Sequence, residues 1–399
     1  MARSMKLVGL FSGIGGIELG FDRALGQLVE TQMLCEWWSP AQQVLSARFP
    51  GVDLHPDVRR LRGLPSGCDV VAAGFPCSDL SQAGRTAGIT GDQSSLVSHV
   101  FEALRLAERR SRRLPWLLIE NVPNMLALDR GQAIRYLVDE LESLGYRWAY
   151  RVVDSRFTGV PQRRRRVLLV ASKSEDPRPV LFADDAGPRP AQELRDDAYG
   201  FYWTEGRGGL GWAEDAVPTL KGGSTIGIPS PPAIWVPDAE SGRKIVTPSI
   251  EDAEELQGFA RGWTATVDGR GLKNRPRWKL VGNAVTVGVA AWVASRLAEP
   301  GTEMATSKEW RGRGAWPSGA WGEKGTVYAV DISEYPRLDP YQHLLDVVDH
   351  DHAAPLSHRG ASGFWRRLQQ GNLGRTPGFR EDVVEHVEAT GAGMEPLPV

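Results

Sequence analysis

The sequence predicts an α/β fold, with a doubly wound and mostly parallel sheet in the first part of the chain. Short apolar runs alternate with segments of helical periodicity over residues 1–173 of the 399-residue chain, and this alternation is typical of doubly wound sheets. Candidate functional residues stand where several apolar runs end: Phe11, Glu36, Pro76, Cys77, Glu120 and Asn121. In open α/β sheets the functional site lies at the carboxyl ends of the strands, so we expect it among these residues.

The elements of this sheet follow one another along the chain. We expect short buried strands at 6–11, 31–36, 70–73, 117–120 and 167–171, because each is an apolar run of strand length. Helical periodicity predicts helices at 17–25, 40–49, 96–110 and 132–144. A glycine-rich turn joins the first strand to the first helix, and its glycines would let a ligand approach the backbone closely.

The composition of the chain changes after residue 173. Residues 174–242 are rich in Pro, Gly and Trp and have little helical periodicity, so we expect an irregular, mostly β module. Helical patterns return at 250–259 and 286–297. The polar segment 299–325 is typical of a linker, and beyond it we expect a strand at 327–332 and helices at 363–368 and 380–388.

Composition limits the class of protein. Hydrophobic residues make up 41% and charged residues 24% of the chain, as in ordinary soluble proteins. No run approaches the roughly 20 apolar residues of a membrane span, and the N-terminus lacks a signal peptide, so we expect a cytoplasmic, nucleoid-associated protein. Three cysteines cannot build a disulfide framework and are not spaced as zinc ligands. The net charge of −2 means that any contact with nucleic acid must use local basic patches.

Four motifs carry the function. The motifs are Phe11-Ser12-Gly13-Ile14-Gly15-Gly16, Gly74-Phe75-Pro76-Cys77, Glu120-Asn121-Val122 and Gln162-Arg163-Arg164-Arg165-Arg166. In order and spacing they resemble the cytosine-C5 DNA methyltransferase family, of the restriction–modification type, over roughly residues 5–298. The resemblance implies a Rossmann-like methyltransferase fold, S-adenosylmethionine as methyl donor with S-adenosylhomocysteine as product, and double-stranded DNA as substrate.

The chemistry of cytosine explains why such residues are needed. Cytosine C5 is a poor nucleophile, and a thiolate that adds to C6 raises its electron density through a transient covalent adduct. Cys77 is the candidate thiol. A carboxylic acid at N3 and a guanidinium at O2 would neutralise the charge that develops on the ring. The family pattern places these two roles on Glu120 and Arg166, with Arg164 as the first arginine of the same motif. Taken singly, Glu120 could equally be a helix-capping partner, and the arginines a solvated face or a phosphate contact.

The methyl-donor site follows from the same resemblance. The glycine-rich turn lacks both the full dinucleotide fingerprint and a Walker lysine. Glu36 can accept hydrogen bonds from ribose hydroxyls, and Trp37 can stack on adenine. The residues expected to bind the cofactor are Phe11, Gly13, Gly15, Glu36, Trp37, Asp57, Val58, Pro76, Leu96, Asn283, Ala284 and Val285.

DNA contacts are expected from several separate segments. The loop 78–91, which follows Cys77, is predicted to close over a cytosine flipped out of the duplex. Ser78 stands there in place of the family's usual Gln. The motifs at 243–248 and 255–259 resemble those that organise the family's recognition domain. The residues expected to contact DNA are Ser81, Gln82, Arg163, Arg165, Thr219 and Leu220, and the segment from Thr219 to Gly227 is expected to enter the major groove.

These assignments divide the chain into five parts. They are a catalytic domain (1–173), a target-recognition domain (174–278, variable over 174–242), a returning helix (279–298), a linker (299–325) and an accessory domain of unknown role (326–399). The accessory part contains Asp349-His350-Asp351-His352, whose spacing does not converge on a metal, so we expect none. We expect a monomer, with a cognate restriction endonuclease or another defence-system protein as a possible partner. The alternatives are a catalytically silent DNA-binding module on the same fold and a small-molecule methyltransferase.

Overall fold

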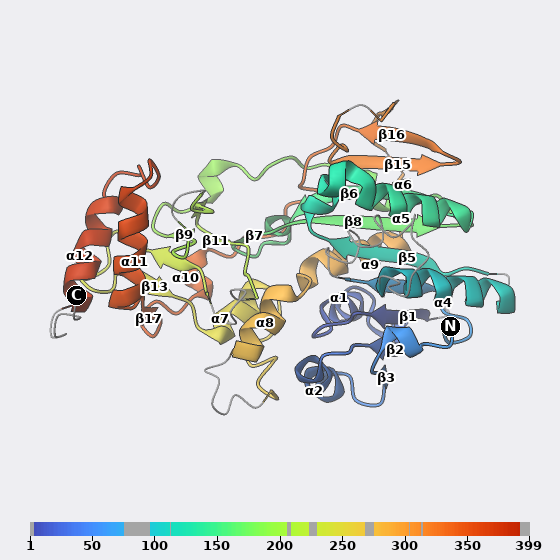
Figure 1. Ribbon diagram of the computed structural model, residues 1–399, viewed down its shortest axis with the longest axis horizontal. Helices are drawn as coiled ribbons and strands as arrows, with labels where there is room; N and C mark the ends of the chain where they lie inside the picture. Colours follow the sequence, from blue (N-terminus) through green and yellow to red (C-terminus); the bar gives the residue numbers. More distant parts are fainter. Residues whose placement is uncertain are drawn as a thin grey trace. The chain divides into compact units, whose positions relative to one another are not determined.

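The computed structural model describes residues 4–75, 96–111, 113–205, 209–222, 230–267, 275–302, 304–312 and 314–391. The chain divides into two compact units. The first consists of Met1–Thr158, Arg165–Pro188 and Ala284–Asp339, and the second of Gly159–Arg164, Arg189–Asn283 and Pro340–Val399. Figure 1 traces the chain through both units, and each is described separately below.

The first unit is built on one large sheet. Among the described residues its ten strands run in the order β14-β16-β15-β6-β8-β5-β4-β1-β2-β3. Their bounds are β1 Met5–Leu10, β2 Val29–Cys35, β3 Asp53–His55, β4 Val70–Ala73, β5 Trp116–Asn121, β6 Arg147–Asp154, β8 Arg165–Ser172, β14 Ser307–Glu309, β15 Gly319–Glu323 and β16 Thr326–Val330. Strands β3, β2, β1, β4 and β5 are parallel.

The other half of the sheet departs from the predicted mostly parallel arrangement. Strand β8 runs antiparallel to both β5 and β6, and β15, β16 and β14 continue the antiparallel pairing. The sequence analysis does not predict β6, because Arg151 interrupts its apolar pattern. In the structure Arg151 is fully buried, and its guanidinium donates to the carbonyls of Ser333 and Leu181, both at 2.9 Å. Burial lowers the pKa of Arg151 to about 10.

Helices cover both faces of this sheet, which confirms the doubly wound α/β class. One face packs against α1 (Gly16–Leu25), α6 (Arg178–Phe182) and α9 (Val287–Ala298), and the other against α4 (Leu96–Ser111) and α5 (Gln132–Ser143). In strand β4, Val71 and Ala73 belong to the buried cluster on one face of the sheet, and Val70 and Ala72 belong to the cluster on the other face. Successive strand residues point to opposite faces. Helix α2 (Ser39–Arg48) follows β2.

Helix α9 returns to the first unit and lies very close to α1. A Cβ atom on Gly20 of α1 would lie 2.5 Å from the Cβ of Ala290 and 2.7 Å from the carbonyl oxygen of Val287, so glycine is what allows this approach. Within the described part of the chain, one segment, Pro276–Ala298, is apolar and long enough for a membrane span by length and composition. Its most apolar window is 67% buried in the structure, as in a core helix.

The segment 299–325, expected to be a linker, contains two strands of the main sheet. Strand β15 pairs with β6, with Gly319 opposite Arg151 and Gly322 opposite Trp148. In Figure 1 the orange strands β15 and β16 lie beside the teal strand β6. The residues up to Asp339 therefore complete the first unit, because backbone hydrogen bonds to β6 hold them in its sheet.

The second unit contains the short strands expected for the β-rich module. A five-stranded sheet runs in the order β10-β9-β12-β13-β17, and β7 pairs in parallel with β11. The bounds are β7 Gln162–Arg163, β9 Tyr199–Phe201, β10 Ala213–Glu214, β11 Val217–Pro218, β12 Ala233–Trp235, β13 Ile245–Thr247 and β17 Ala354–Pro355. Its helices are α7 Ile250–Leu256, α8 Arg275–Asn283, α10 Leu344–Val347, α11 His358–Gln369 and α12 Phe379–Gly391. Short 3-10 turns occur in both units: Ala191–Glu193 belongs to the second, and the first contains Gly26–Leu28, Val58–Arg60, Pro123–Leu126, Leu128–Gly131 and Ser155–Thr158.

The C-terminal part of the chain is built into this second unit. Strand β17 pairs with β13, with Pro355 opposite Val246. Helices α11 and α12 supply Phe364, Leu368, Phe379 and Val383 to a buried cluster that also contains Phe201 and Trp235 of the sheet. Residues 326–399, expected to form one accessory domain, are thus divided between the two units at Asp339, because their apolar side chains complete two different cores.

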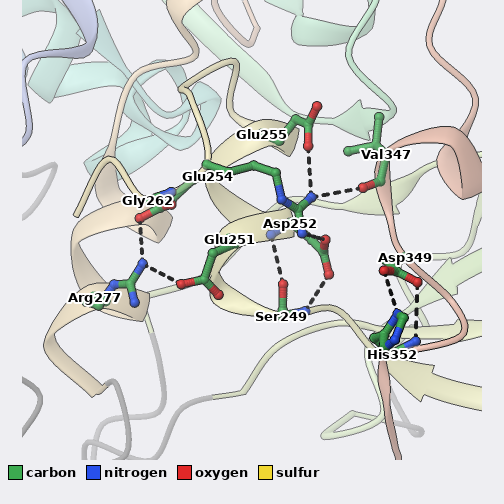
Figure 2. Close-up of polar contacts among 11 residues, drawn as sticks. Ser249, Glu251, Asp252, Glu254, Glu255, Gly262, Arg277, Val347, Asp349 and His352 are labelled. Carbon is green, nitrogen blue, oxygen red and sulfur yellow. Dashed lines mark hydrogen bonds and ion pairs between the residues drawn. The ribbon is translucent and has the colours of Figure 1, made fainter. Parts of the chain in front are cut away.

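A buried carboxylate organises the turn that follows α7 (Figure 2). Glu254 is fully buried and accepts hydrogen bonds from the backbone N–H groups of Gly262, Trp263 and Thr264 at 2.5, 3.1 and 2.8 Å. Arg277 of α8 lies 3.0 Å from the same carboxylate. A buried charge is tolerated when it is paired and hydrogen-bonded in this way. Glu254 thereby joins α7, the following turn and α8.

The packing of the C-terminal helices gives a stability prediction. Phe379 contacts the rings of Phe201, Trp212 and Trp235, with centroids 4.9–5.2 Å apart. We expect Phe379→Ala to lower the free energy of unfolding by about 3–5 kcal/mol, because a buried aromatic side chain leaves a cavity. Urea unfolding followed by tryptophan fluorescence measures this loss.

A matched control is Leu28→Ala in the first unit, whose side chain is 51% exposed. We expect that change to alter stability by no more than about 0.5 kcal/mol. Equal stability of the Phe379→Ala and Leu28→Ala variants would contradict the packing of α12 on the five-stranded sheet of the second unit.

Candidate active site

Glu120 and Arg166 form an ion pair at the carboxyl end of β5. Arg166 Nε lies 2.8 Å from Glu120 Oε1, and the two side chains are 12% and 10% exposed. The antiparallel register of β5 and β8 brings them together, because Glu120 lies opposite Leu168 and Arg166, two residues before Leu168 in β8, points to the same face of the sheet. The structure therefore brings together the two residues that the sequence assigns to N3 and O2 of a cytosine.

Asn121 fixes the backbone that leads to the expected nucleophile. Its side-chain amide donates to the carbonyl of Phe75 at 3.0 Å, and the residue is buried. Sequence reasoning did not assign this role, although the position of Asn121 within Glu-Asn-Val was a signal. Pro76, Cys77, Ser81, Gln82 and the loop 78–91 lie outside the described residues.

Arg164 has backbone partners in the second unit. It is 1% exposed, and its Nη1 donates to the carbonyls of Leu220 at 3.3 Å and Gly282 at 3.2 Å. Gly282 belongs to the Val-Gly-Asn-Ala-Val motif, and Leu220 to the segment expected to enter the major groove. Arg164 therefore positions two segments of the second unit, whereas Arg166 pairs with Glu120 in the first.

A buried pair of amides lies at the centre of the same arrangement. Gln162 donates to the carbonyl of Leu256 at 2.9 Å and to Gln257 Oε1 at 3.1 Å, and it accepts from the N–H of Leu220 at 3.1 Å. Gln257 donates to the carbonyl of Val281 at 3.0 Å. Sequence reasoning missed both glutamines as positioning residues, although each stands inside a recognised motif.

The glycine-rich turn and Glu36 are joined by a hydrogen bond. The N–H of Gly13 donates to Glu36 Oε2 at 2.9 Å, and the N–H of Trp38 donates to Oε1 at 2.8 Å. Phe11 and Gly13 both have a φ of +57°. A Cβ atom on Gly13 would meet no atom within 4 Å, whereas one on Gly15 would lie 2.2 Å from the Phe49 ring. Open space for a ligand thus exists at Gly13, while Gly15 is required for packing.

The residues around Glu36 fit the chemistry of an adenosine group. Burial raises the pKa of the Glu36 carboxyl, and the adjacent Trp37 side chain is 73% exposed, so an aromatic face is available for stacking. Asp57 is bound by Arg59 at 2.7 Å, and the hydrogen bonds from Arg59 lower the pKa of Asp57. Val58 is buried in the core and Leu96 packs against the same cluster.

The remaining predicted residues lie in several different environments. The Asn-Ala-Val segment crosses the boundary between the units, with Asn283 exposed at the end of α8 and Ala284 buried. Val285 packs against the core with α9.

Among the expected DNA contacts, Arg163 is exposed, and its carbonyl accepts from the Thr219 hydroxyl at 3.0 Å. Leu220 is buried, at 1% exposed. Arg165 is ion-paired with Glu334.

Two further features bear on the site. Glu18 of α1 is buried, and burial raises its pKa to about 7; a Cβ atom on Gly9 would collide with its carboxylate. Among the described residues, no group of three or more His, Cys, Asp or Glu side chains could hold a metal ion. In the predicted Asp/His cluster, His352 instead pairs with Asp349 at 2.8 Å (Figure 2).

Comparison with solved structures defines the class of fold. The crystal structure of the S. pombe Dnmt2 methyltransferase matches with a TM-score of 0.54 and 15% identity, covering 74% of this chain and 98% of that chain. The Entamoeba histolytica methyltransferase EhMeth matches with a TM-score of 0.52 and 14% identity, covering 73% and 97%. This chain has the methyltransferase fold.

Sequence comparison gives the family. The model of the C-5 cytosine-specific DNA methylases matches residues 5–197. Type II methyltransferase M2.BsuMI of Bacillus subtilis (strain 168) is 46% identical over 370 residues, covering 91% of this chain and 93% of the relative. Type II methyltransferase M.BsuFI of Bacillus subtilis is 35% identical over 172 residues. The chain belongs to the C-5 cytosine-specific DNA methylase family, as the four motifs predicted.

The burial of Glu18 gives a pH prediction. Its pKa is about 7 in the folded protein against an ordinary value of 4.5, so the native state binds more protons than the unfolded state between these values. Stability therefore falls as pH rises from about 4.5 to 7, by about 3 kcal/mol at about 1.4 kcal/mol per pKa unit. Glu18→Gln does not titrate, so its stability relative to the native sequence should increase by that amount over this range. Urea unfolding of both proteins at pH 4.5, 6 and 7.5 measures it, and a difference independent of pH would contradict it.

Proposed function

We propose that this chain methylates C5 of a cytosine that has been flipped out of duplex DNA. Cys77 adds to C6, a proton from Glu120 goes to N3, and Arg166 stabilises the negative charge at O2. Once C5 has taken up the methyl group, water takes the C5 proton, the electron pair of that bond expels the Cys77 thiolate from C6, and N3 returns its proton to Glu120. The Glu120–Arg166 pair is the observation that carries the proposal, because an acid and a guanidinium held 2.8 Å apart suit the adjacent N3 and O2 atoms of one ring. Asn121, which holds the Phe75 carbonyl, positions the chain just before Pro76-Cys77.

S-adenosylmethionine would supply an electrophilic methyl group. The exposed Trp37 ring, the open space at Gly13 and the Glu36 carboxylate would hold its adenosine part. Glu36 would accept from the ribose hydroxyls while remaining fixed by the N–H groups of Gly13 and Trp38.

The biological setting follows from the relatives. We infer that the protein modifies DNA in a restriction–modification or related defence system, in the cytoplasm at the nucleoid. A cognate restriction endonuclease or another defence-system protein would be its partner. The relatives named as type II methyltransferases support this setting, and a monomer suffices for the chemistry.

The activity is tested in a host that lacks DNA methylation. Bisulfite sequencing of its genome after expression of this chain should show protected cytosines in one short recurring context, which also gives the recognition sequence. Soluble protein that binds S-adenosylmethionine but protects no cytosine would instead favour the catalytically silent DNA-binding module.

The nucleophile is tested by Cys77→Ser. We expect loss of methyl transfer with DNA and cofactor binding retained, because a hydroxyl is a far weaker nucleophile than a thiolate. On a duplex with 5-fluorocytosine at the target, the native protein should form an adduct that survives denaturation, because fluorine cannot leave C5 as a proton does. Turnover by the Cys77→Ser variant would show that another group attacks C6.

The two arginines of the motif should fail in different ways. Arg166→Ala should lower the single-turnover rate by about 10²-fold or more, because a group that stabilises developing charge is lost. Arg164→Ala should lower the free energy of unfolding by about 1–3 kcal/mol, because the carbonyls of Leu220 and Gly282 lose a donor. Rapid-quench assays and urea unfolding separate the two effects. An Arg164→Ala variant of native stability with a rate as low as that of Arg166→Ala would give Arg164 a direct role in catalysis.

A further inference from the structure

The C-terminal part of the second unit contains an unusually basic segment. Residues 353–380 hold five arginines and one histidine but no Asp or Glu, in a chain whose net charge is −2. Helix α11 occupies the middle of this segment and carries three of the arginines: Arg359, Arg366 and Arg367. The recognised motifs end near residue 298 and the family model matches residues 5–197, so neither assigns a role to this helix.

Two of these arginines share one exposed face of α11. Arg359 and Arg366 are seven residues apart, which is two helical turns and about 10.5 Å along the axis. Both are exposed, whereas Phe364 and Leu368 on the opposite face belong to the buried cluster of the second unit. Gly363 lies between the two arginines on their face and adds no side chain. Phosphates of one DNA strand follow one another every 3.4 Å along the duplex axis, so this spacing spans about three of them.

The third arginine ties α11 to the turn at residues 202–205. Arg367 Nε donates to the carbonyl of Glu205 at 2.9 Å, and its Nη2 donates to the carbonyl of Trp203 at 2.8 Å. This turn in turn contacts the segment expected to enter the major groove. Tyr202 donates its hydroxyl proton to the carbonyl of Thr219 at 2.7 Å, and Lys221 Nζ lies 3.7 Å from the centre of the Tyr202 ring.

Two of the four acidic groups of the neighbouring helix are paired with a lysine. In α12, Asp382 and Glu385 lie 2.7 and 3.0 Å from Lys244 Nζ. Helix α11 itself contains no Asp or Glu, so its exposed face has a positive charge, and Arg367 connects this helix to a segment expected to bind DNA. A basic surface of this kind complements the phosphate backbone, which attracts Lys and Arg without regard to sequence.

We propose that Arg359 and Arg366 contact phosphates of duplex DNA flanking the recognition sequence. The inference rests on the proposed function, because it extends the DNA surface of the same recognition unit. Arg367 is a positioning residue in this arrangement, since it binds backbone carbonyls. The role of the C-terminal helices would then be both to complete the core of the recognition unit and to lengthen its contact with DNA.

The test uses the full-length Arg359→Ala/Arg366→Ala variant and a 30-base-pair duplex centred on the sequence found by bisulfite sequencing. Each lost phosphate contact lowers the slope of log affinity against log salt by about 0.9, so we expect the slope to fall by about 2. Between 50 and 200 mM salt the variant should lose about tenfold less affinity than the native protein. The rate at saturating DNA and the affinity for S-adenosylmethionine should not change.

Three further proteins make the result decisive. Lys308→Ala/Arg311→Ala removes two exposed positive charges from the first unit and should keep the native slope. Arg359→Lys/Arg366→Lys should also keep it, because a phosphate contact needs only the charge. Arg367→Ala should lower the affinity for the recognition sequence more than it lowers the affinity for unrelated DNA. A native slope in Arg359→Ala/Arg366→Ala, with native methylation by the unmodified protein, would overturn this inference alone; absent methylation by the unmodified protein would overturn the proposed function.

Discussion

The extended segment 162–166 is the constraint on which the interior contacts of each unit depend. Its residues alternate between buried and exposed, with Gln162 and Arg164 buried, Arg166 mostly covered, and Arg163 and Arg165 exposed. Successive residues of an extended chain point to opposite sides. The Gln-x-Arg-x-Arg pattern is therefore a set of three side chains on one side of the backbone, of which Gln162 and Arg164 both bind Leu220 while Arg166 binds Glu120.

These three side chains act on different units, although they are only two residues apart. Gln162 and Arg164 bind carbonyl and amide groups of the second unit, whereas Arg166 pairs with the Glu120 carboxylate of the first. The first two satisfy buried backbone groups that would otherwise carry a desolvation penalty. Arg166 faces a carboxylate, so it can also respond to charge that develops on a bound base. In the proposed reaction, a single motif would thus have both a structural and a chemical function.

The C-terminal residues also stabilise the second unit, whose sheet is small and irregular. A unit made of two- and three-residue strands buries little apolar surface by itself, and small cores are marginally stable. More than half of the buried cluster of this unit comes from the C-terminal residues, which are Leu356, Ala361, Phe364, Leu368, Phe379 and Val383. The chain before them adds three strands to the edge of the main sheet. Both cores are therefore completed by residues that follow the recognised motifs.

The sequence by itself determined the family and four of the five parallel strands, and it singled out the two residues, Glu120 and Arg166, that form the ion pair of the candidate site. Strands β1, β2, β4 and β5 lie within one or two residues of their expected positions, because buried parallel strands are continuous apolar runs with polar residues at their ends. Glu120 and Arg166 could be paired from the motif order. The two glycines of the turn look alike in the sequence, and their different roles depend on Phe49, which lies more than thirty residues away.

Only the tertiary structure decided the antiparallel half of the sheet, the role of Arg164 and the place of residues 299–391. Strand β6 and its partners β15 and β8 are joined by hydrogen bonds between distant segments, and local periodicity contains no record of such partners. Arg164 and Arg166 are the same residue type in one motif, and what each binds depends on which carbonyl or carboxylate the fold brings to it. Local patterns determine which face of an element is buried, whereas long-range contacts determine what buries it.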